Sequence, residues 1–143
     1  MNLTDPLDLP EMVTLDRREC LRLLERGLIG RVIYTDGAMP AARPVNYAIM
    51  GEEIIFRTGG AFADATNDAI VAFEVDDVDV ATHTGWSVLA LGRARRVTDP
   101  DRLTEIAASL PQPWAPGRTV RTVAIPAWRL SGRRIVAADA RTG

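Results

Sequence analysis

The chain has 143 residues, of which 47% are apolar and 25% charged, and its formal net charge is −2. This length and composition are typical of one globular domain with its own core, and they favour neither a disordered nor a fibrous chain. The slight negative charge, the lack of a long apolar run and the single cysteine favour a cytoplasmic protein with no nucleic acid or membrane partner.

The basic residues restrict the chemistry further, because all 17 of them are arginine and the chain has no lysine. Lysine Schiff-base catalysis and a Walker phosphate-binding loop are therefore excluded. A phosphate group would have to be held by arginine, by backbone N–H groups or by hydroxyls.

The N-terminal part of the chain predicts an arm followed by a helix. Residues 1–13 contain helix-breaking prolines and predict an extended or mobile arm, so we place the single domain at residues 14–143. Asp16 is a suitable N-cap for a helix, and Gly27 is well placed to end it. The predicted apolar face of this helix consists of Leu21, Leu24 and Leu28.

From Gly30 onward the apolar spacing becomes that of strands separated by turn residues. The predicted strands are Gly30–Tyr34, Ala42–Ile49, Glu53–Thr58, Ile70–Val75, Trp86–Val97, Thr119–Ile125 and Ser131–Ala137. Short helices are expected at residues 61–67 and 100–109, and prolines predict a loop around Trp114. Six or seven short strands with few helices predict a small antiparallel barrel rather than a parallel βαβ sheet.

One candidate ligand-binding strand contains Arg43, Val45, Asn46 and Tyr47. Alternate residues of a strand share a face, so Arg43, Val45 and Tyr47 are expected on one side and Asn46 on the other. Asparagine is uncommon within strands, and it would either bind a ligand edge or lie on a solvated face.

The next strand ends in Arg57 and Thr58, directly before Gly59-Gly60 and a predicted helix start. An arginine, a hydroxyl and uncapped backbone N–H groups suit an anion. The alternative is that Arg57 serves solubility at a strand end.

Other reactive side chains predict little chemistry. The acidic residues Glu74, Asp76, Asp77 and Asp79 lack a calcium-loop pattern, and we interpret them as a solvated turn. His83 is the only histidine, which excludes a multi-histidine metal site within one chain. Cys20 is expected to be a packing residue. We therefore expect no metal.

Two later segments combine tryptophan with polar groups. Trp86-Ser87 opens a strand, and Trp128 is followed by arginines that include Arg133. Tryptophan could stack on a flat ligand, or it could pack in the core or at an interface between subunits. The arginines could reach a ligand phosphate, or they could lie on a solvated edge strand.

Taken together, these segments resemble the pyridoxamine 5′-phosphate oxidase-like family of flavin-binding split barrels, particularly its small actinobacterial-type members. The resemblance runs from about Leu15 to Ile135 and depends on the order and spacing of several pieces. The pieces are GRVIYTDG, RPVNYAIMGEEIIFRT, VAFEVDDVD, GWSVLALGRA, PWAPG and SGRRI.

The resemblance implies a six-stranded antiparallel split β-barrel that forms a homodimer with FMN at the subunit interface. It implies that the strand of Arg43, Val45, Asn46 and Tyr47 lies along the flavin ring. Arg57 and Thr58 would then approach the ribityl phosphate, and Trp86-Ser87 would contact the ring. Trp128 and Arg133 resemble positions that the partner subunit contributes.

One departure from the family leaves the function open. Phe62 and Ala63 stand where many members have a basic residue that grips the phosphate. Loss of that contact would cost on the order of 1.5–3 kcal/mol, which Arg43 or Arg57 could offset. The first hypothesis is an FMN-dependent oxidoreductase acting on a small molecule, and no catalytic residue is assigned. The alternatives are a non-catalytic module for flavin, deazaflavin or haem, and a split-barrel dimer whose cofactor site has decayed.

Overall fold

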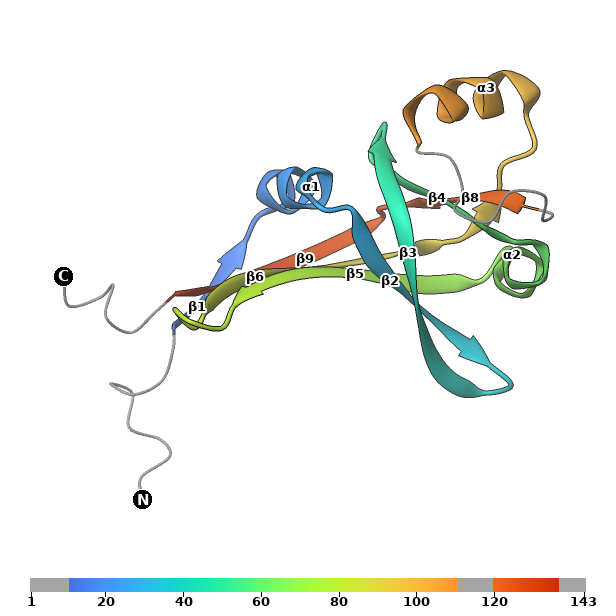
Figure 1. The fold of residues 1–143 in the computed structure, drawn as a ribbon. Helices are drawn as coiled ribbons and strands as arrows, with labels where there is room; N and C mark the ends of the chain where they lie inside the picture. The colour runs from blue at the N-terminus through green and yellow to red at the C-terminus, as the bar shows by residue number, and fades with distance from the viewer. Residues whose placement is uncertain (1–10, 111–119, 137–143) are drawn as a thin grey trace.

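A computed structural model describes residues 11–110 and 120–136 of the protein (Figure 1). Within these residues the chain forms nine strands and three helices, so it is mainly β as predicted. The strands are β1 (Glu11–Leu15), β2 (Ile29–Asp36), β3 (Met39–Met50), β4 (Glu53–Gly59), β5 (Ile70–Asp79), β6 (Thr84–Arg93), β7 (Arg95–Arg96), β8 (Val120–Pro126) and β9 (Arg129–Val136). The helices are α1 (Arg17–Arg26), α2 (Gly60–Thr66) and α3 (Pro100–Ser109).

The strands form one curled antiparallel sheet in the order β1-β9-β6-β5-β2-β3-β4-β8-β7. Strand β3 changes partner along its length: residues 39–46 pair with β2, and residues 47–50 pair with β4. This change of partner divides the sheet into two halves that curl toward each other (Figure 1). The architecture is therefore a split β-barrel, as predicted.

The resemblance implied six strands and the sequence pattern predicted up to seven, whereas the structure has nine. Two features account for the two strands beyond seven. The run predicted as Trp86–Val97 is interrupted at Ala94, whose N–H and carbonyl turn aside to bond Ala69 and Asp68. In addition, β1 begins inside the predicted arm, because residues 11–15 pair with β9. The arm's residues 1–10 and the proline-rich loop around Trp114 lie outside the described residues.

Tight turns join β3 to β2 and to β4, between strands that the sequence predicted to be separated by turn residues. Gly37 and Ala38 have φ angles of 54° and 68°, and Gly51 and Glu52 have φ angles of 56° and 62°. Two successive left-handed residues make the type I′ geometry that suits the right-handed twist of paired strands. These turns fix the registers of β2 with β3 and of β3 with β4.

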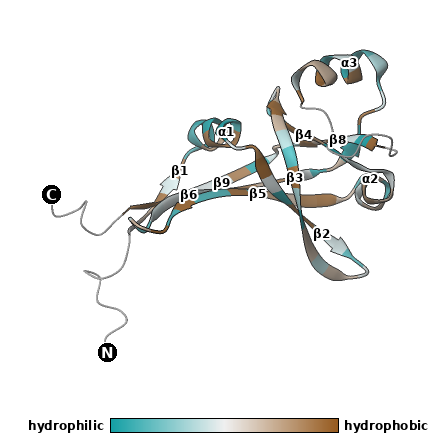
Figure 2. Ribbon diagram, viewed as in Figure 1, coloured by the Kyte–Doolittle hydropathy of each residue, from teal (hydrophilic) through white to brown (hydrophobic). Residues whose placement is uncertain are grey.

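The inner face of the curled sheet carries the main core. Buried apolar side chains alternate with more exposed ones along the strands, and the strands in Figure 2 change repeatedly between hydrophobic and hydrophilic colours. Members of this core include Val32, Tyr47, Phe56, Phe73, Val88 and Ile125. Gly30 is required beneath Phe73, because a methyl group there would lie 2.2 Å from the aromatic ring.

Helix α1 covers one end of the inner face. The Asp16 side chain accepts a hydrogen bond from the Glu19 N–H at 2.9 Å, which confirms the predicted N-cap. The buried side of α1 consists of Cys20, Leu23 and Leu24. The predicted leucine face is therefore partly wrong, since Leu28 lies beyond the helix end and is 78% exposed.

Helix α3 covers a different part of the sheet. Its Ile106 and Leu110 pack on Ile55 and Ala124, which lie on the side of β4 and β8 that faces away from the main core. Among the described residues, no helix covers the outer face of β2, β5, β6 and β9 (Figure 1). None of the described helices is long and apolar enough to cross a membrane.

Candidate functional site

The ten predicted ligand-binding residues fall into separate regions of the barrel. Three lie on the inner face, three on the outer face, three near α2, and Trp128 lies at the turn between β8 and β9. Their binding roles stay predictions, and their positions differ in what they can contact.

The inner-face group is buried. It consists of Val45, Tyr47 and Trp86, which belong to the main core. The Tyr47 hydroxyl donates to the Leu24 carbonyl at 2.5 Å, and burial raises the pKa of Tyr47 to about 12. A methyl group at Gly27 would lie 2.2 Å from this hydroxyl oxygen. Tyr47 therefore joins α1 to the barrel, and its phenol stays protonated at neutral pH.

The outer-face group is accessible. It consists of Asn46, Ser87 and Arg133. Ser87 is directly opposite Arg133 on β9 and opposite Asp76 on β5, and Asn46 is opposite Ile29 on β2. The expected alternation along β3 is confirmed, because Asn46 is exposed while Val45 and Tyr47 are buried. A flat ligand that lies across these strands would meet polar side chains from β3, β6 and β9.

The third group lies at the barrel end beside α2. The guanidinium carbon of Arg43 lies 4.2 Å from the centroid of the Phe62 ring, which is a cation–π contact. The Phe62 ring also meets Tyr34 edge-on, with centroids 4.8 Å apart. The fold therefore brings a guanidinium from β3 to Phe62, near which the family resemblance predicted a basic residue. Arg57 and Thr58 lie near the end of β4, shortly before α2, and both are partly exposed.

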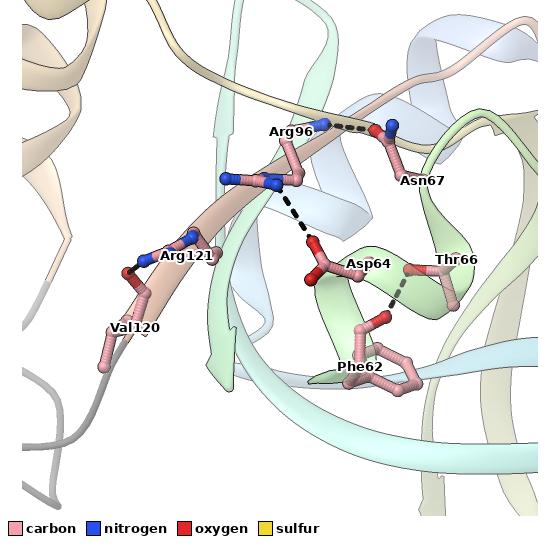
Figure 3. A network of polar contacts seen from close by, with 7 residues as sticks. All are labelled: Phe62, Asp64, Thr66, Asn67, Arg96, Val120 and Arg121. Carbon is pink, nitrogen blue, oxygen red and sulfur yellow. Dashed lines mark hydrogen bonds and ion pairs between the residues drawn. The ribbon is translucent and has the colours of Figure 1, made fainter. Parts of the chain in front are cut away.

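Polar contacts hold α2 in place (Figure 3). Asp64 accepts a hydrogen bond from Arg96 of β7 at 2.9 Å, and the Asn67 side chain accepts from the Arg96 backbone N–H at 3.0 Å. Thr66 is buried, and its hydroxyl donates to the Phe62 carbonyl at 2.9 Å. These contacts hold the α2 backbone from Phe62 onward, and so help to position the ring on which Arg43 lies.

Two further features concern the tryptophans. Trp128 is 56% exposed, and the guanidinium carbon of Arg93 lies 6.0 Å from its ring centroid. Trp86 lines a cavity of about 340 Å³ near the end of β5, β6 and β9. The cavity's other lining residues are Asp77, Asp79, Thr84, Gly85, Arg134, Ile135 and Val136. None of the other nine predicted residues lines this cavity.

The acidic segment differs from the solvated turn that we expected. Glu74 lies within β5, its side chain is 23% exposed, and it accepts a hydrogen bond from Arg31 at 3.1 Å. Asp76 lies 3.7 Å from the same guanidinium. Only Asp79 reaches the turn, where it accepts from the Ala81 and Thr82 N–H groups. Period-two spacing places Glu74 and Asp76 on one face, and this signal could have identified the group in the sequence.

Glu74 has a perturbed acidity. Burial, followed by the hydrogen bond and charge of Asp76, raises its pKa to about 7, although Arg31 acts in the opposite direction. Cys20, in contrast, is fully buried, and burial raises the pKa of its thiol. No group of three or more His, Cys, Asp or Glu residues in the described part of the chain could hold a metal ion.

The strand order and the change of partner along β3 define a split-barrel protein. The family model described as pyridoxamine 5′-phosphate oxidase matches residues 16–134, so the chain belongs to this family. A Mycobacterium tuberculosis relative, described as uncharacterized protein Rv0080, is 38% identical over 144 residues, which cover 96% of this chain and 93% of the relative.

Two solved structures illustrate the similarity. The FAD-binding protein from Mycobacterium smegmatis has a TM-score of 0.74 and 31% identity, and the match covers 85% of this chain and 98% of that protein. A conserved Corynebacterium diphtheriae protein of unknown function has a TM-score of 0.75 and 28% identity, with coverage of 87% and 98%.

Proposed function

We propose that the protein is a flavin-dependent oxidoreductase that binds FMN and acts on a small molecule. The observation that carries the proposal is the Arg43 guanidinium on the Phe62 ring. It would supply a positive charge near the position where the resemblance predicts a basic residue for the cofactor phosphate. Membership of the family and the FAD-binding M. smegmatis neighbour support a flavin rather than an unrelated ligand.

The residues of the chain fit such a cofactor. Arg43, Arg57 and Thr58 would hold the phosphate at the barrel end, while Asn46 and Ser87 would hydrogen-bond the polar edge of the flavin ring. A bound flavin supplies hydride and electron transfer, and the protein's part is to bind, orient and shield it. True pyridoxamine 5′-phosphate oxidation is not proposed, because a second phosphate would need its own basic pocket.

We further propose that the protein acts as a homodimer. The outer face of β2, β5, β6 and β9 has no covering helix among the described residues, although it includes partly exposed Ile33, Leu89 and Leu91. A second subunit on this face would exclude water from the flavin ring, and it would bring its own Trp128 and Arg133 toward the ligand. Light scattering during gel filtration would test this state.

The decisive experiment is a titration of cofactor-stripped protein with FMN, followed by absorbance and fluorescence. FAD is titrated in parallel, because FAD is the ligand in the description of the M. smegmatis neighbour. We expect saturable FMN binding at micromolar affinity or better. Each of Arg43→Ala and Arg57→Ala should weaken binding by about one to two decades through loss of a charge-assisted contact.

The matched control is Arg18→Ala, an exposed arginine on α1 far along the chain from the proposed site. It should bind FMN like the unmodified protein. Tighter binding of FAD than FMN would correct the cofactor and leave the flavin proposal intact. If neither flavin binds at high micromolar concentration, the flavin proposal is wrong, and haem and a deazaflavin would be titrated next.

A further inference from the structure

A compact group of three charged side chains lies on the outer face of the sheet, and none of the three is among the residues that we assign to cofactor binding. Arg31 lies 3.1 Å from a Glu74 carboxylate oxygen and 3.7 Å from an Asp76 oxygen. One guanidinium therefore forms ion pairs with two carboxylates. The two carboxylates differ in exposure, since the Glu74 side chain is 23% exposed and the Asp76 side chain 39%. A shared proton is thus favoured on Glu74, the more buried carboxylate.

The register of the sheet places Glu74 beside the residues proposed to meet the flavin ring. Pro44, Arg31, Glu74, Leu89 and Ser131 are successive partners across β3, β2, β5, β6 and β9. Asn46 and Ser87 are two residues along from Pro44 and Leu89, so they lie on the same face in the next row. Diagonal neighbours in antiparallel sheets are about 7–8 Å apart, within reach of a long side chain. Glu74 is therefore a diagonal neighbour of Ser87.

We propose that Glu74 is the acid–base residue of this face, exchanging a proton with a substrate bound against the flavin. The inference rests on the proposed flavin-dependent function. With an alcohol or amine as substrate, a bound flavin would accept the C–H hydrogen with both of its electrons as hydride. The O–H or N–H bond on the adjacent heteroatom would break, its electron pair would form the new C=O or C=N bond, and Glu74 would take the proton. In the reverse direction Glu74 returns the proton as hydride arrives from the flavin.

The neighbours of Glu74 define its protonation. Arg31 faces it from β2 and favours the carboxylate, and Asp76 on its own strand disfavours it. Strand β6 presents the uncharged Ser87 and Leu89, and β9 presents Ser131 and the charged Arg133. With a pKa of about 7, Glu74 is present in both protonation states near neutral pH, which suits a residue that both takes and gives a proton. Arg31 and Asp76 are positioning residues in this scheme.

The test compares the full-length protein with Glu74→Gln, which retains an oxygen that can accept from Arg31 but cannot ionise. The control variant is Asp77→Asn, a carboxyl on the same strand that points to the opposite face. FMN affinity is measured first for all three proteins. Infrared difference spectra between oxidised and dithionite-reduced FMN-loaded protein are then recorded across pH 5 to 9, together with the reduction potential of the bound flavin.

We expect all three proteins to bind FMN with affinities that agree within about threefold. A carboxylic acid band should titrate near pH 7 in the unmodified protein and in Asp77→Asn, and it should be lost in Glu74→Gln. The pH dependence of the flavin's reduction potential should change in Glu74→Gln and remain unchanged in Asp77→Asn. If FMN binds but the band and the potential profile survive in Glu74→Gln, the role of Glu74 is overturned while the flavin function stands. If FMN does not bind the unmodified protein, the proposed function itself fails.

Discussion

The two faces of the sheet formed by β2, β5, β6 and β9 belong to the same strands but differ in burial and in charge. The inner face carries Val32, Phe73 and Val88, which are almost completely buried under the rest of the barrel and α1. The outer face mixes half-exposed Leu89 and Leu91 with the Arg31–Glu74–Asp76 group. The inner face therefore determines the fold, whereas the outer face is available for a ligand or a second subunit.

The largest expected effect tests the inner face. Phe73 is fully buried, meets Tyr47 edge-on at 4.9 Å between centroids, and covers Gly30. Phe73→Ala should lower the free energy of unfolding by about 3–5 kcal/mol, because it removes buried area and leaves a cavity. Denaturant unfolding followed by circular dichroism measures this loss.

The matched change on the outer face is Leu89→Ala, on the strand next to β5. This substitution should lower the free energy of unfolding by less than about 1 kcal/mol if solvent covers the outer face. A loss close to that of Phe73→Ala would mean that the outer face is buried in solution, and it would support the proposed homodimer. A concentration dependence of the unfolding midpoint would separate the two cases.

The second effect concerns pH and the outer face. The pKa of Glu74 is about 7 in the folded protein and 4.5 in the reference state. The raised value means that protonation favours the folded state, so this stabilisation is complete below pH 4.5 and is lost as pH rises through 7. Relative to Glu74→Gln, the unmodified protein should therefore lose on the order of 2–3 kcal/mol between pH 4 and pH 8.

The measurement is urea unfolding of both proteins at one-unit steps of pH, with the difference taken at each step. Taking the difference cancels the titration of the other carboxylates that the two proteins share. A flat difference would show that Arg31 holds Glu74 ionised throughout, and the acid–base role would lose its physical basis.

The sequence pattern predicted the two faces of the strands better than it predicted how the strands pair. Apolar alternation and turn residues identified most of the strands and placed Val45 and Tyr47 on the opposite face from Asn46, as observed. Alternation specifies a strand and its faces but not its partners. The pairing of β1 with β9 and the change of partner along β3 depend on contacts between residues distant in the chain.

The candidate site was less predictable for the same reason. The cation–π contact of Arg43 with Phe62 joins residues from β3 and α2, and a missing basic residue was all that the local pattern indicated. Likewise, the acidic segment looked like a solvated turn until Arg31 from another strand was placed beside Glu74. Ligand-binding roles for the ten predicted residues stay predictions.

The third effect tests whether Tyr47 serves the fold or a ligand. Its ring lies in the core, and its hydroxyl bonds the Leu24 carbonyl at 2.5 Å. Tyr47→Phe should cost about 1–2 kcal/mol, because the buried carbonyl of Leu24 loses its side-chain donor. FMN affinity should be unchanged if the phenol only joins α1 to the barrel. A tenfold weaker affinity in a variant of otherwise normal stability would place the hydroxyl in the cofactor site instead.

The smallest effect concerns the helix that closes the inner face. Asp16 accepts a hydrogen bond from the Glu19 N–H, and Asp16→Ala should cost about 1 kcal/mol, as is typical for loss of an N-cap. Leu24→Ala, by comparison, removes a fully buried side chain and should cost about 2–5 kcal/mol. Thermal and denaturant unfolding of the two variants measure both losses. If Asp16→Ala lowers the free energy of unfolding as much as Leu24→Ala does, the N-cap contributes as much as the buried side chains to holding α1 on the barrel. If Asp16→Ala lowers it less, as we expect, then packing on the inner face holds α1 in place, and the N-cap stabilises only the first turn of the helix.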